Sequence, residues 1–389
     1  MKILFASSPG VGHVQPVIGL ALAARRRGHA IAWATARDAR SFLEAQSIEV
    51  FDAGAPFVEC QNEYRARWPE KSMLKGRDIA GHAFPRQFGN VIASRMLPGL
   101  EHAISQWKPD LIINETGAVA APLAARKFGV RHITHAFGLP MPASRLHHTA
   151  NEIAPLWQAA GWDVPEFAGL YDHGAIEISA PSLQAACPNP VLAKKALLQR
   201  PSSVTAGPND RLPDSLREFL NSRAGQPIIY VTFGTVFNKH TGIAAVLDAA
   251  AKISALFVAT TGAGVSATPT KALARNVWIG DYVPQSLLLP LCSVVVSHAG
   301  SGTLTGAMSH GLPQLCLPQG ADQFRNADAL AACDAGVSLE GESVNESSIA
   351  NAMQTLLDDS SFRHNAEKLK QEIAKMPTPD ETMVRLEAL

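Results

Sequence analysis

A short apolar run, a glycine-rich turn and a helical pattern open the chain. Residues 2–7 read KILFAS, residues 8–15 read SPGVGHVQ, and residues 30–35 read AIAWAT. Proline is favoured in the first turn of a helix and glycine just beyond its last turn, so a helix is predicted from Pro16 to Gly28. Apolar strands that alternate with helices are typical of a parallel sheet covered on both faces. The sequence therefore predicts an α/β fold with a loop at the carboxyl end of its first strand.

The same pattern recurs along the chain. It reappears at Asp110–Asn114, followed by a helix that ends at Gly129. Further strands are predicted at 228–233, 255–260, 277–279, 294–297 and 314–317. Residues 63–90 and 137–171 lack clear periodicity, and we expect irregular insertions there. Long insertions at the carboxyl edge of such a sheet usually bind a ligand.

The length of 389 residues predicts two domains. Proline, serine, glycine and asparagine crowd residues 201–226, as in a linker. We predict an N-terminal domain over 1–205, a linker over 206–226 and a C-terminal domain over 227–370. Residues 371–389 are predicted to form a C-terminal helix that packs back on the N-terminal domain.

Charge and cysteine content exclude several classes of function. The chain has 34 Lys+Arg and 34 Asp+Glu, which gives no electrostatic reason to expect a nucleic acid or an anionic membrane as partner. The five cysteines form no CxxC pair, which argues against a disulfide framework or a zinc site and favours a reducing, cytoplasmic setting. No apolar run reaches the roughly 18 residues of a membrane span.

The most informative motif follows a predicted strand at 294–297. It reads His298-Ala-Gly-Ser-Gly-Thr303 and leads into a helix that ends at Gly311. Gly300 and Gly302 would let a ligand approach the backbone, and the free N–H groups of a helix start suit a diphosphate. Taken alone, a glycine-rich turn with a structural histidine explains the motif equally well.

The surrounding sequence decides between these interpretations. Tyr282-Val-Pro-Gln285 lies upstream, Asp322-Gln323 downstream, a GxGHxxP loop near the start, and Phe233-Gly234-Thr235 at the opening of the second half. Together they strongly resemble the family 1 glycosyltransferases, most closely the bacterial enzymes that decorate natural products such as polyketides, enediynes and macrolides. The resemblance implies a GT-B fold, with two Rossmann-like domains whose parallel sheets face a central cleft. It also implies hexosyl or deoxyhexosyl transfer.

The resemblance assigns roles to named residues. Tyr282 would stack on the nucleotide base, where the family usually has Trp, and Asp322 with Gln323 would bind the donor sugar. An Asp at a helix start has an ordinary structural explanation too. The residues implied in binding the nucleotide and diphosphate are Gly12, Thr235, Tyr282, Val283, Gln285, His298, Gly300, Ser301, Gly302 and Thr303.

One position departs from the UDP-sugar members of the family. They usually carry a Glu eight residues after the motif histidine, where it binds the ribose hydroxyls; here that residue is Gly306. A site without the hydrogen-bonding partner loses its preference for ribose over deoxyribose. We therefore predict a dTDP-sugar donor.

His13 is the predicted general base. The family uses a histidine in this loop to deprotonate the acceptor, and a neutral imidazole suits that task. Glu115 falls where the family has a carboxylate that orients the base; the competing explanation is an exposed loop Glu. The expected reaction is a single displacement with inversion. The chain contains no Asp-x-Asp, so we expect no metal or other cofactor.

The acceptor would be an apolar natural product. Phe84, Phe88, Phe137 and Met141 are predicted to line its site, and Trp68, Trp157 and Trp162 are further candidates. For any one of them, ordinary core packing is the stronger interpretation. His135, His147, His148 and His173 match no strong metal-ligand motif.

Several alternatives stay open on sequence alone. They are a UDP-sugar transferase, transfer to carbon rather than oxygen, a sugar-nucleotide epimerase, and an inactive partner protein that stabilises another transferase. The intact motifs argue against the last two. A homodimer is an expectation from the family alone.

Overall fold

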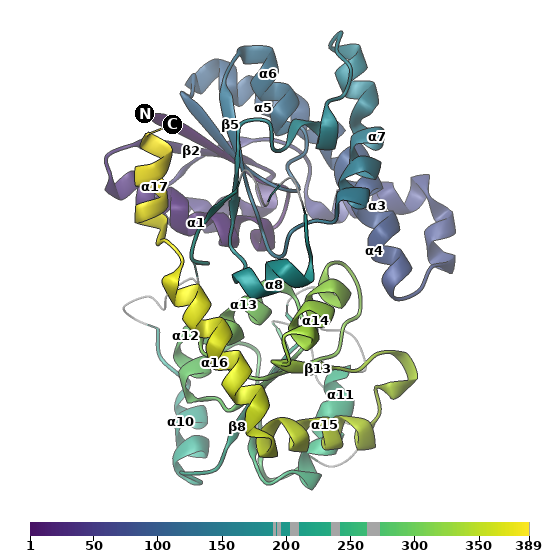
Figure 1. Ribbon diagram of the computed structural model, residues 1–389, viewed down its shortest axis with the longest axis vertical. Coiled ribbons are helices and arrows are strands. Elements are labelled where there is room, and N and C mark those ends of the chain that lie inside the picture. Colours follow the sequence, from purple (N-terminus) through teal and green to yellow (C-terminus); the bar gives the residue numbers. More distant parts are fainter. Residues whose placement is uncertain (190–191, 193–195, 203–209, 235–241, 263–272, 389) are drawn as a thin grey trace. The chain divides into compact units, whose positions relative to one another are not determined.

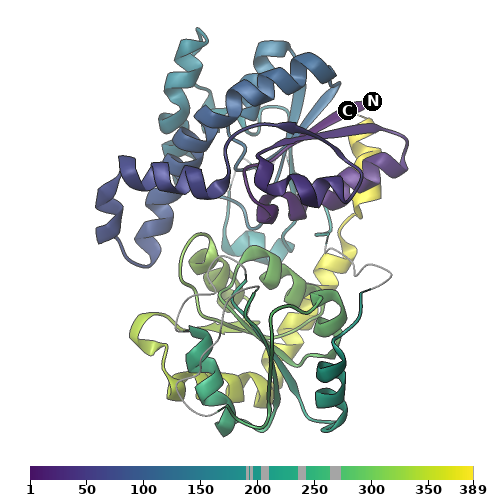
Figure 2. The same cartoon turned by 180° about the vertical axis from the view of Figure 1, so that it is seen from behind.

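The computed structural model describes residues 1–189, 192, 196–202, 210–234, 242–262 and 273–388. The chain forms two compact units (Figures 1 and 2). Unit 1 comprises Met1–Ser179, Cys187–Ser202 and Met376–Leu389, and unit 2 comprises Ala180–Ala186 and Ser203–Lys375.

Unit 1 is built on a parallel sheet with the strand order β3-β2-β1-β4-β5-β6-β7. The order reverses between β1 and β4, which are direct neighbours, and ligands of open α/β sheets bind at such a switch point. The strands are β1 (Lys2–Ala6), β2 (Ala30–Thr35), β3 (Glu49–Asp52), β4 (Leu111–Glu115), β5 (Arg131–His135), β6 (Ala175–Glu177) and β7 (Ala196–Leu198).

The two faces of this sheet are buried in separate cores because side chains alternate along a strand. In β1, Ile3 and Phe5 pack with α1 (Val11–Arg26) and α17 (Pro379–Glu387), whereas Leu4 and Ala6 pack with α5 (Ala93–Trp107) and α6 (Ala121–Phe128). The helices are α1 (Val11–Arg26), α2 (Arg40–Glu44), α3 (Phe57–Arg67), α4 (Arg77–Phe84), the π-helical η3 (Pro85–Ile92), α5 (Ala93–Trp107), α6 (Ala121–Phe128), α7 (Ala143–Ala159) and α17 (Pro379–Glu387), with 3₁₀ turns η1 (Arg37–Ala39), η2 (Pro69–Met73) and η4 (Glu166–Gly169).

Unit 2 repeats the architecture with the parallel strand order β10-β9-β8-β11-β12-β13. Its switch point lies between β8 and β11, which pair directly. The strands are β8 (Ile228–Thr232), β9 (Leu256–Thr260), β10 (Val277–Gly280), β11 (Val294–Ser297), β12 (Gln314–Cys316) and β13 (Gly336–Ser338). The helices are α8 (Pro181–Ala186), α10 (Asp214–Asn221), α11 (Gly242–Ala249), α12 (Gln285–Leu288), α13 (Ser301–Ser309), α14 (Gln323–Ala332), α15 (Glu346–Asp358) and α16 (Ser360–Lys375), with 3₁₀ turns η5 (Ala250–Lys252), η6 (Leu289–Leu291) and η7 (Gly341–Ser343). The predicted α/β fold is confirmed.

Two local predictions were wrong. Helix α1 begins at Val11, not at Pro16, which lies inside the helix and removes only the hydrogen bond to the Gly12 carbonyl. The segments 63–90 and 137–171, expected to be irregular, contain helical segments, including η3 and the 17-residue α7.

The chain passes between the units at four points, after residues 179, 186, 202 and 375. The predicted boundary at residue 205 lies in 203–209, outside the described residues, and α10 occupies part of the predicted linker with Leu216 fully buried. Residues 180–186 group with unit 2, and the chain returns to unit 1 at Met376. Within unit 1, the backbone N–H of Arg200 donates to the carbonyl of Pro377 at 2.6 Å.

Among the helices of the described segments, none is long and apolar enough to span a membrane.

Candidate active site

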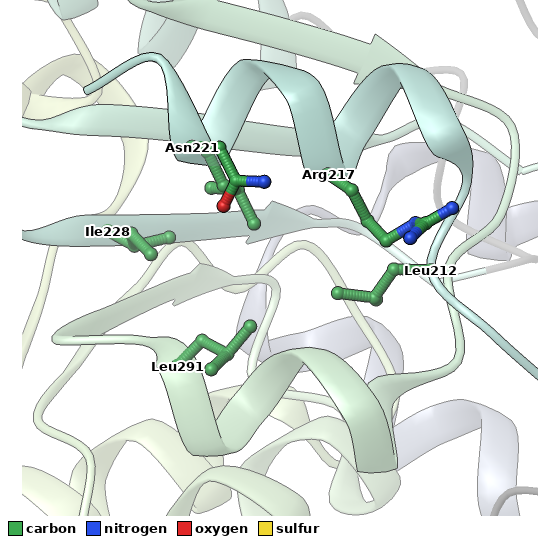
Figure 3. A pocket seen from close by; sticks show the side chains of 6 residues that line it. Leu212, Arg217, Asn221, Ile228 and Leu291 are labelled. Carbon is green, nitrogen blue, oxygen red and sulfur yellow. The ribbon is translucent and has the colours of Figure 1, made fainter. Parts of the chain in front are cut away.

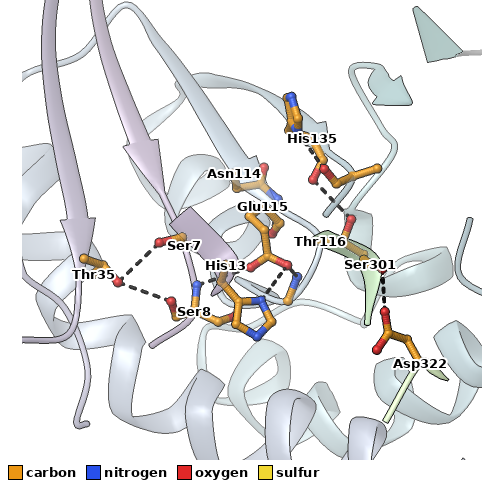
Figure 4. Close-up of polar contacts among 12 residues, drawn as sticks. Ser7, Ser8, His13, Thr35, Asn114, Glu115, Thr116, His135, Ser301 and Asp322 are labelled. Atoms are coloured by element: carbon orange, nitrogen blue, oxygen red, sulfur yellow. Dashed lines mark hydrogen bonds and ion pairs between the residues drawn. The ribbon is translucent and has the colours of Figure 1, made fainter. Parts of the chain in front are cut away.

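His13 and Glu115 meet at the switch point of unit 1. Ala6 of β1 is paired with Asn114 of β4, which brings the chain after each strand to the same edge. His13 lies in the first turn of α1 and Glu115 is the last residue of β4. The His13 Nδ1 is 3.2 Å from the Glu115 Oε1 (Figure 4). The structure therefore brings the two predicted catalytic residues together, and Glu115 is not an exposed loop residue.

Glu115 is fully buried and held by backbone donors. Its Oε1 accepts from the Gly117 N–H at 2.6 Å and its Oε2 from the Ser8 N–H at 3.3 Å. A Cβ at Gly117 would lie 2.6 Å from the Ser8 Oγ and 3.1 Å from the Glu115 Oε1, so a larger residue there would have to displace the Ser8 hydroxyl. With both oxygens engaged, the carboxylate has a fixed orientation toward the imidazole.

Hydrogen bonds between buried side chains connect to the Ser8 backbone, and the sequence analysis did not predict them. The Trp33 Nε1 donates to the Ser7 Oγ at 3.0 Å, and the Ser7 Oγ donates to the Thr35 Oγ1 at 3.3 Å. Thr35 in turn donates to the Ser8 carbonyl at 3.3 Å (Figure 4). These contacts fix the loop that supplies a donor to Glu115. In the sequence, the only signal for these hydrogen bonds was that small polar residues stand at the ends of two neighbouring strands.

Two of the four predicted acceptor-site residues flank His13. The ring centroids of Phe88 and Phe137 lie 5.4 and 5.3 Å from that of His13, and both side chains are partly exposed. Phe84 stacks on Phe88 at 4.7 Å but is buried, as is Met141, and both belong to one core cluster. Of the predicted apolar set, Phe88 and Phe137 therefore have surface left for a ligand beside the base.

The three tryptophan candidates belong to the packing of unit 1. Trp157 is buried in its core, and Trp68 and Trp162 pack against the same cluster. This agrees with the stronger of the two interpretations of each residue.

In unit 2 the His298–Thr303 motif forms the turn between β11 and α13 and the first residues of α13. The His298 ring lies so close to Gly300 that a Cβ there would be 2.4 Å from the His298 Nε2. Gly234, which has a φ of +68°, lies on another side of the ring, and a Cβ at Gly234 would be 3.0 Å from the His298 Cε1. A Cβ at Gly302 would meet no atom within 4 Å. The first glycine therefore makes room for the histidine, and the second leaves open space at the helix start.

His298 is buried, and burial lowers its pKa to about 4, although the nearby Asp322 carboxylate and a hydrogen bond to the Thr232 backbone act in the opposite direction. The ring is neutral near pH 7. It therefore contributes hydrogen bonding rather than charge to this turn, and the electrostatic attraction for an anion comes from the start of α13.

Asp322 and Gln323 differ in their surroundings. The Asp322 Oδ2 accepts from the Ser301 Oγ at 2.5 Å (Figure 4) and from the Asn326 Nδ2 at 2.9 Å. Gln323 is buried, and its Oε1 accepts from the backbone N–H groups of Gln319 and Gly320 at 2.8 and 3.0 Å. The side-chain oxygen of Gln323 is thus already hydrogen-bonded to the loop that precedes α14.

The predicted nucleotide-base residues lie at the start of α12. The Tyr282 side chain is 72% exposed, which leaves its ring face open for stacking. Val283 is buried in the core, so its backbone is the part that would meet a ligand. The Gln285 Nε2 donates to the Tyr230 hydroxyl at 3.4 Å. Thr235 lies outside the described residues.

Gly306 lies in α13 opposite this segment. A Cβ at that position would lie 3.2 Å from the Leu289 Cδ1 and 3.7 Å from the Gln285 Oε1. A side chain there would press on the end of the Leu289 side chain, and residue 306 itself supplies no carboxylate.

The part of the chain that the structure describes contains no group of three or more His, Cys, Asp or Glu side chains arranged to hold a metal ion. Among the histidines considered, His135 is fully buried and contacts the Ala136 carbonyl and the Gln199 side chain.

A hollow of about 300 Å³ lies elsewhere in unit 2 (Figure 3). Ile228, the first residue of β8, lines it, so it opens at the amino end of that strand. The predicted site residues of unit 2 follow the carboxyl ends of the strands instead. The remaining lining residues are Leu212, Arg217, Leu220, Asn221 and Leu291.

Comparison with known proteins finds chains of similar sequence among sugar transferases. The family models of the N- and C-terminal domains of erythromycin biosynthesis protein CIII-like proteins match residues 64–166 and 244–389. An L-demethylnoviosyl transferase of Streptomyces niveus is 27% identical over 97% of this chain and 96% of its own. The elloramycin glycosyltransferase ElmGT of Streptomyces olivaceus is 27% identical over 99% of this chain and 97% of its own.

Solved structures give the same result for the fold. The glycosyltransferase VinC in complex with dTDP has a TM-score of 0.80 and 25% identity, covering 100% of this chain and 99% of that one. The Streptomyces sp. SF2575 glycosyltransferase SsfS6, complexed with thymidine diphosphate, has a TM-score of 0.79 and 24% identity over the whole of both chains. The fold is that of the GT-B glycosyltransferases, and the chain belongs to the erythromycin biosynthesis protein CIII-like family of natural-product glycosyltransferases.

Proposed function

We propose that the protein transfers a deoxysugar from a dTDP-sugar to a hydroxyl group of an apolar natural product, with inversion and without a metal ion. The observation that carries this proposal is the contact of His13 with Glu115 at the switch point of unit 1. A buried carboxylate on Nδ1 fixes the imidazole tautomer, so Nε2 is the nitrogen that accepts a proton. The flanking rings of Phe88 and Phe137 suit an apolar acceptor.

The reaction is a single displacement. The His13 Nε2 takes the proton of the acceptor hydroxyl as its oxygen attacks the anomeric carbon of the donor. The new glycosidic bond forms as the bond from that carbon to the diphosphate oxygen breaks, and the electron pair leaves with dTDP. Glu115 stabilises the imidazolium that results. A positioned base of this kind typically contributes about 10²–10⁴-fold to the rate.

The leaving group is held by unit 2. The open space at Gly302 and the free N–H groups at the start of α13 would receive the diphosphate, and preorganised donors of this kind stabilise the charge that develops on it. Asp322 would accept from the sugar hydroxyls. Gln323 would contribute through its amide nitrogen, since its oxygen already holds the preceding loop.

A thymidine nucleotide is the donor that this site favours. Gly306 supplies no carboxylate for a ribose hydroxyl, and Leu289 and Gln285 lie against the position. Two related proteins, VinC and SsfS6, are known in complex with dTDP or thymidine diphosphate. Both observations point to dTDP rather than UDP.

Calorimetric titration of the purified protein with dTDP and with UDP, with EDTA present, tests the proposal. We expect dTDP to bind at least tenfold more tightly than UDP. Tighter UDP binding would overturn the donor assignment and leave the roles of His13 and Glu115 standing. Binding of neither nucleotide would overturn the proposed transferase activity. Binding that appears only after a divalent metal replaces the EDTA would overturn the metal-independent mechanism.

A further inference from the structure

A buried amide in α14 joins two parts of the donor site. Asn326 has no exposed surface. Its Nδ2 donates to the Ala299 carbonyl at 2.9 Å, the Asp322 Oδ2 at 2.9 Å and the Ser301 Oγ at 3.1 Å. One side-chain nitrogen therefore contacts both the turn before α13 and the carboxylate that begins α14.

These contacts converge on an unusual backbone conformation. Ala299 has a φ of +61°, in the left-handed region that residues with a Cβ rarely adopt because the Cβ approaches the following carbonyl oxygen. The Asn326 hydrogen bond to the Ala299 carbonyl and the Ser297 Oγ, which accepts from the Ala299 N–H at 3.0 Å, hold this residue on both sides. The conformation of Ala299 sets the direction in which the following residues, Gly300 and Ser301, enter the helix.

The same amide also orients Asp322. With its Oδ2 occupied by Ser301 and Asn326, the Asp322 carboxylate has its Oδ1 left for a ligand. An aspartate in place of Asn326 would put a second carboxylate against Asp322 and the Ala299 carbonyl, where only a donor is compatible with the acceptors.

We propose that Asn326 is a positioning residue of the donor site, which fixes the diphosphate-binding turn and the sugar-binding carboxylate in one arrangement. This inference rests on the proposed function, because it takes the turn at 298–303 as the diphosphate site. It adds a residue that touches neither the diphosphate nor the sugar. Its effect is exerted through Ala299, Ser301 and Asp322.

The test compares Asn326→Ala with Leu330→Ala. Leu330 is buried on the same helix and makes no contact with the turn through a polar group, so its truncation reports the cost of a cavity in α14 alone. Affinities for dTDP and dTMP are measured by calorimetry on folded protein. We expect Asn326→Ala to weaken dTDP binding about tenfold and dTMP binding much less, and Leu330→Ala to leave both within about twofold.

Two further variants keep the inference falsifiable if Asn326→Ala unfolds. Asn326→Ser retains one donor and is expected to recover part of the dTDP affinity, whereas Asn326→Asp is expected to lose it. Equal dTDP affinity in wild type and all folded Asn326 variants would overturn the inference, as would equal loss in Leu330→Ala. If the wild-type protein itself bound no dTDP, the proposed function would fail first.

Discussion

At the scale of single residues, Glu115 is the clearest test of the proposed mechanism. Its two oxygens accept from the backbone N–H groups of Gly117 and Ser8 and face the His13 Nδ1. Each of these three neighbours is a donor that needs an acceptor. A glutamine has one acceptor oxygen, and its amide must face a donor. We expect Glu115→Gln to lower kcat by roughly 10²–10⁴-fold, because the imidazole loses the partner that fixes its tautomer.

The measurement is steady-state kinetics together with the dTDP dissociation constant. The dissociation constant should stay unchanged, because the predicted donor-site residues other than Gly12 lie in unit 2. Glu44→Gln, at an exposed carboxylate paired with Arg40, serves as the control and should retain full activity. A Glu115→Gln enzyme with wild-type kcat would show that the carboxylate does not assist His13.

At the scale of elements, the two glycines before and within α13 predict opposite outcomes. A methyl group at Gly300 would lie 2.4 Å from the His298 Nε2, whereas one at Gly302 would meet no protein atom within 4 Å. Gly300→Ala should therefore destabilise the protein by about 1–3 kcal/mol through overpacking. Gly302→Ala should be neutral or stabilise by up to about 1 kcal/mol, because alanine favours the helix.

The prediction for dTDP binding is different. Both variants should bind dTDP more weakly. Gly302→Ala fills the space in which the diphosphate would approach the backbone, and Gly300→Ala displaces the His298 ring in the same turn. Chemical denaturation and calorimetry on the two variants measure the two effects separately. A Gly302→Ala protein with wild-type affinity would show that the diphosphate does not approach this glycine.

The same elements show what the sequence could and could not predict. Strands such as 30–35 and 294–297 were correctly located because they are continuous apolar runs buried on both faces. Strands β3, β6, β7 and β13, of three or four residues each, were missed. Strand β12 has three residues too but was predicted, so short length alone does not explain the difference. In α7 the internal Pro155 and the histidines hide a helix whose stability comes from packing on η3 and η4.

The residues of the candidate site likewise include some that the sequence predicted and some that it did not. His13, Glu115 and the glycines were predicted because a motif places them in the chain. Asn326 was not predicted, because its role depends on the burial of α14 against the turn at Ala299, which no local pattern encodes.

At the scale of the whole chain, the last helix ties the C-terminus to the first helix of unit 1. Met383 and Leu386 of α17 are buried in the core that α1 shares with the sheet. Beside them, Glu387 accepts from Arg27 in a bidentate pair at 2.8 and 2.7 Å, and lies 2.6 Å from the His29 Nε2. Polar contacts and apolar burial therefore hold the same helix.

This contact gives the stability of the protein a defined pH dependence. Hydrogen bonds from Arg27 and then from His29 lower the pKa of Glu387 to about 2. A carboxylate whose pKa is lower in the folded state stabilises the fold above its ordinary pKa of about 4.3, and the contribution is lost as the pH falls from there toward 2. Glu387→Gln should therefore lower Tm at pH 6–7 and approach the wild-type Tm below about pH 3. Glu44→Gln, far from this contact in sequence and on a different helix, is the control. A constant difference in Tm from pH 7 to pH 3 would mean that Glu387 acts through packing rather than charge, and the apolar contacts of Met383 and Leu386 would then hold α17 without electrostatic help.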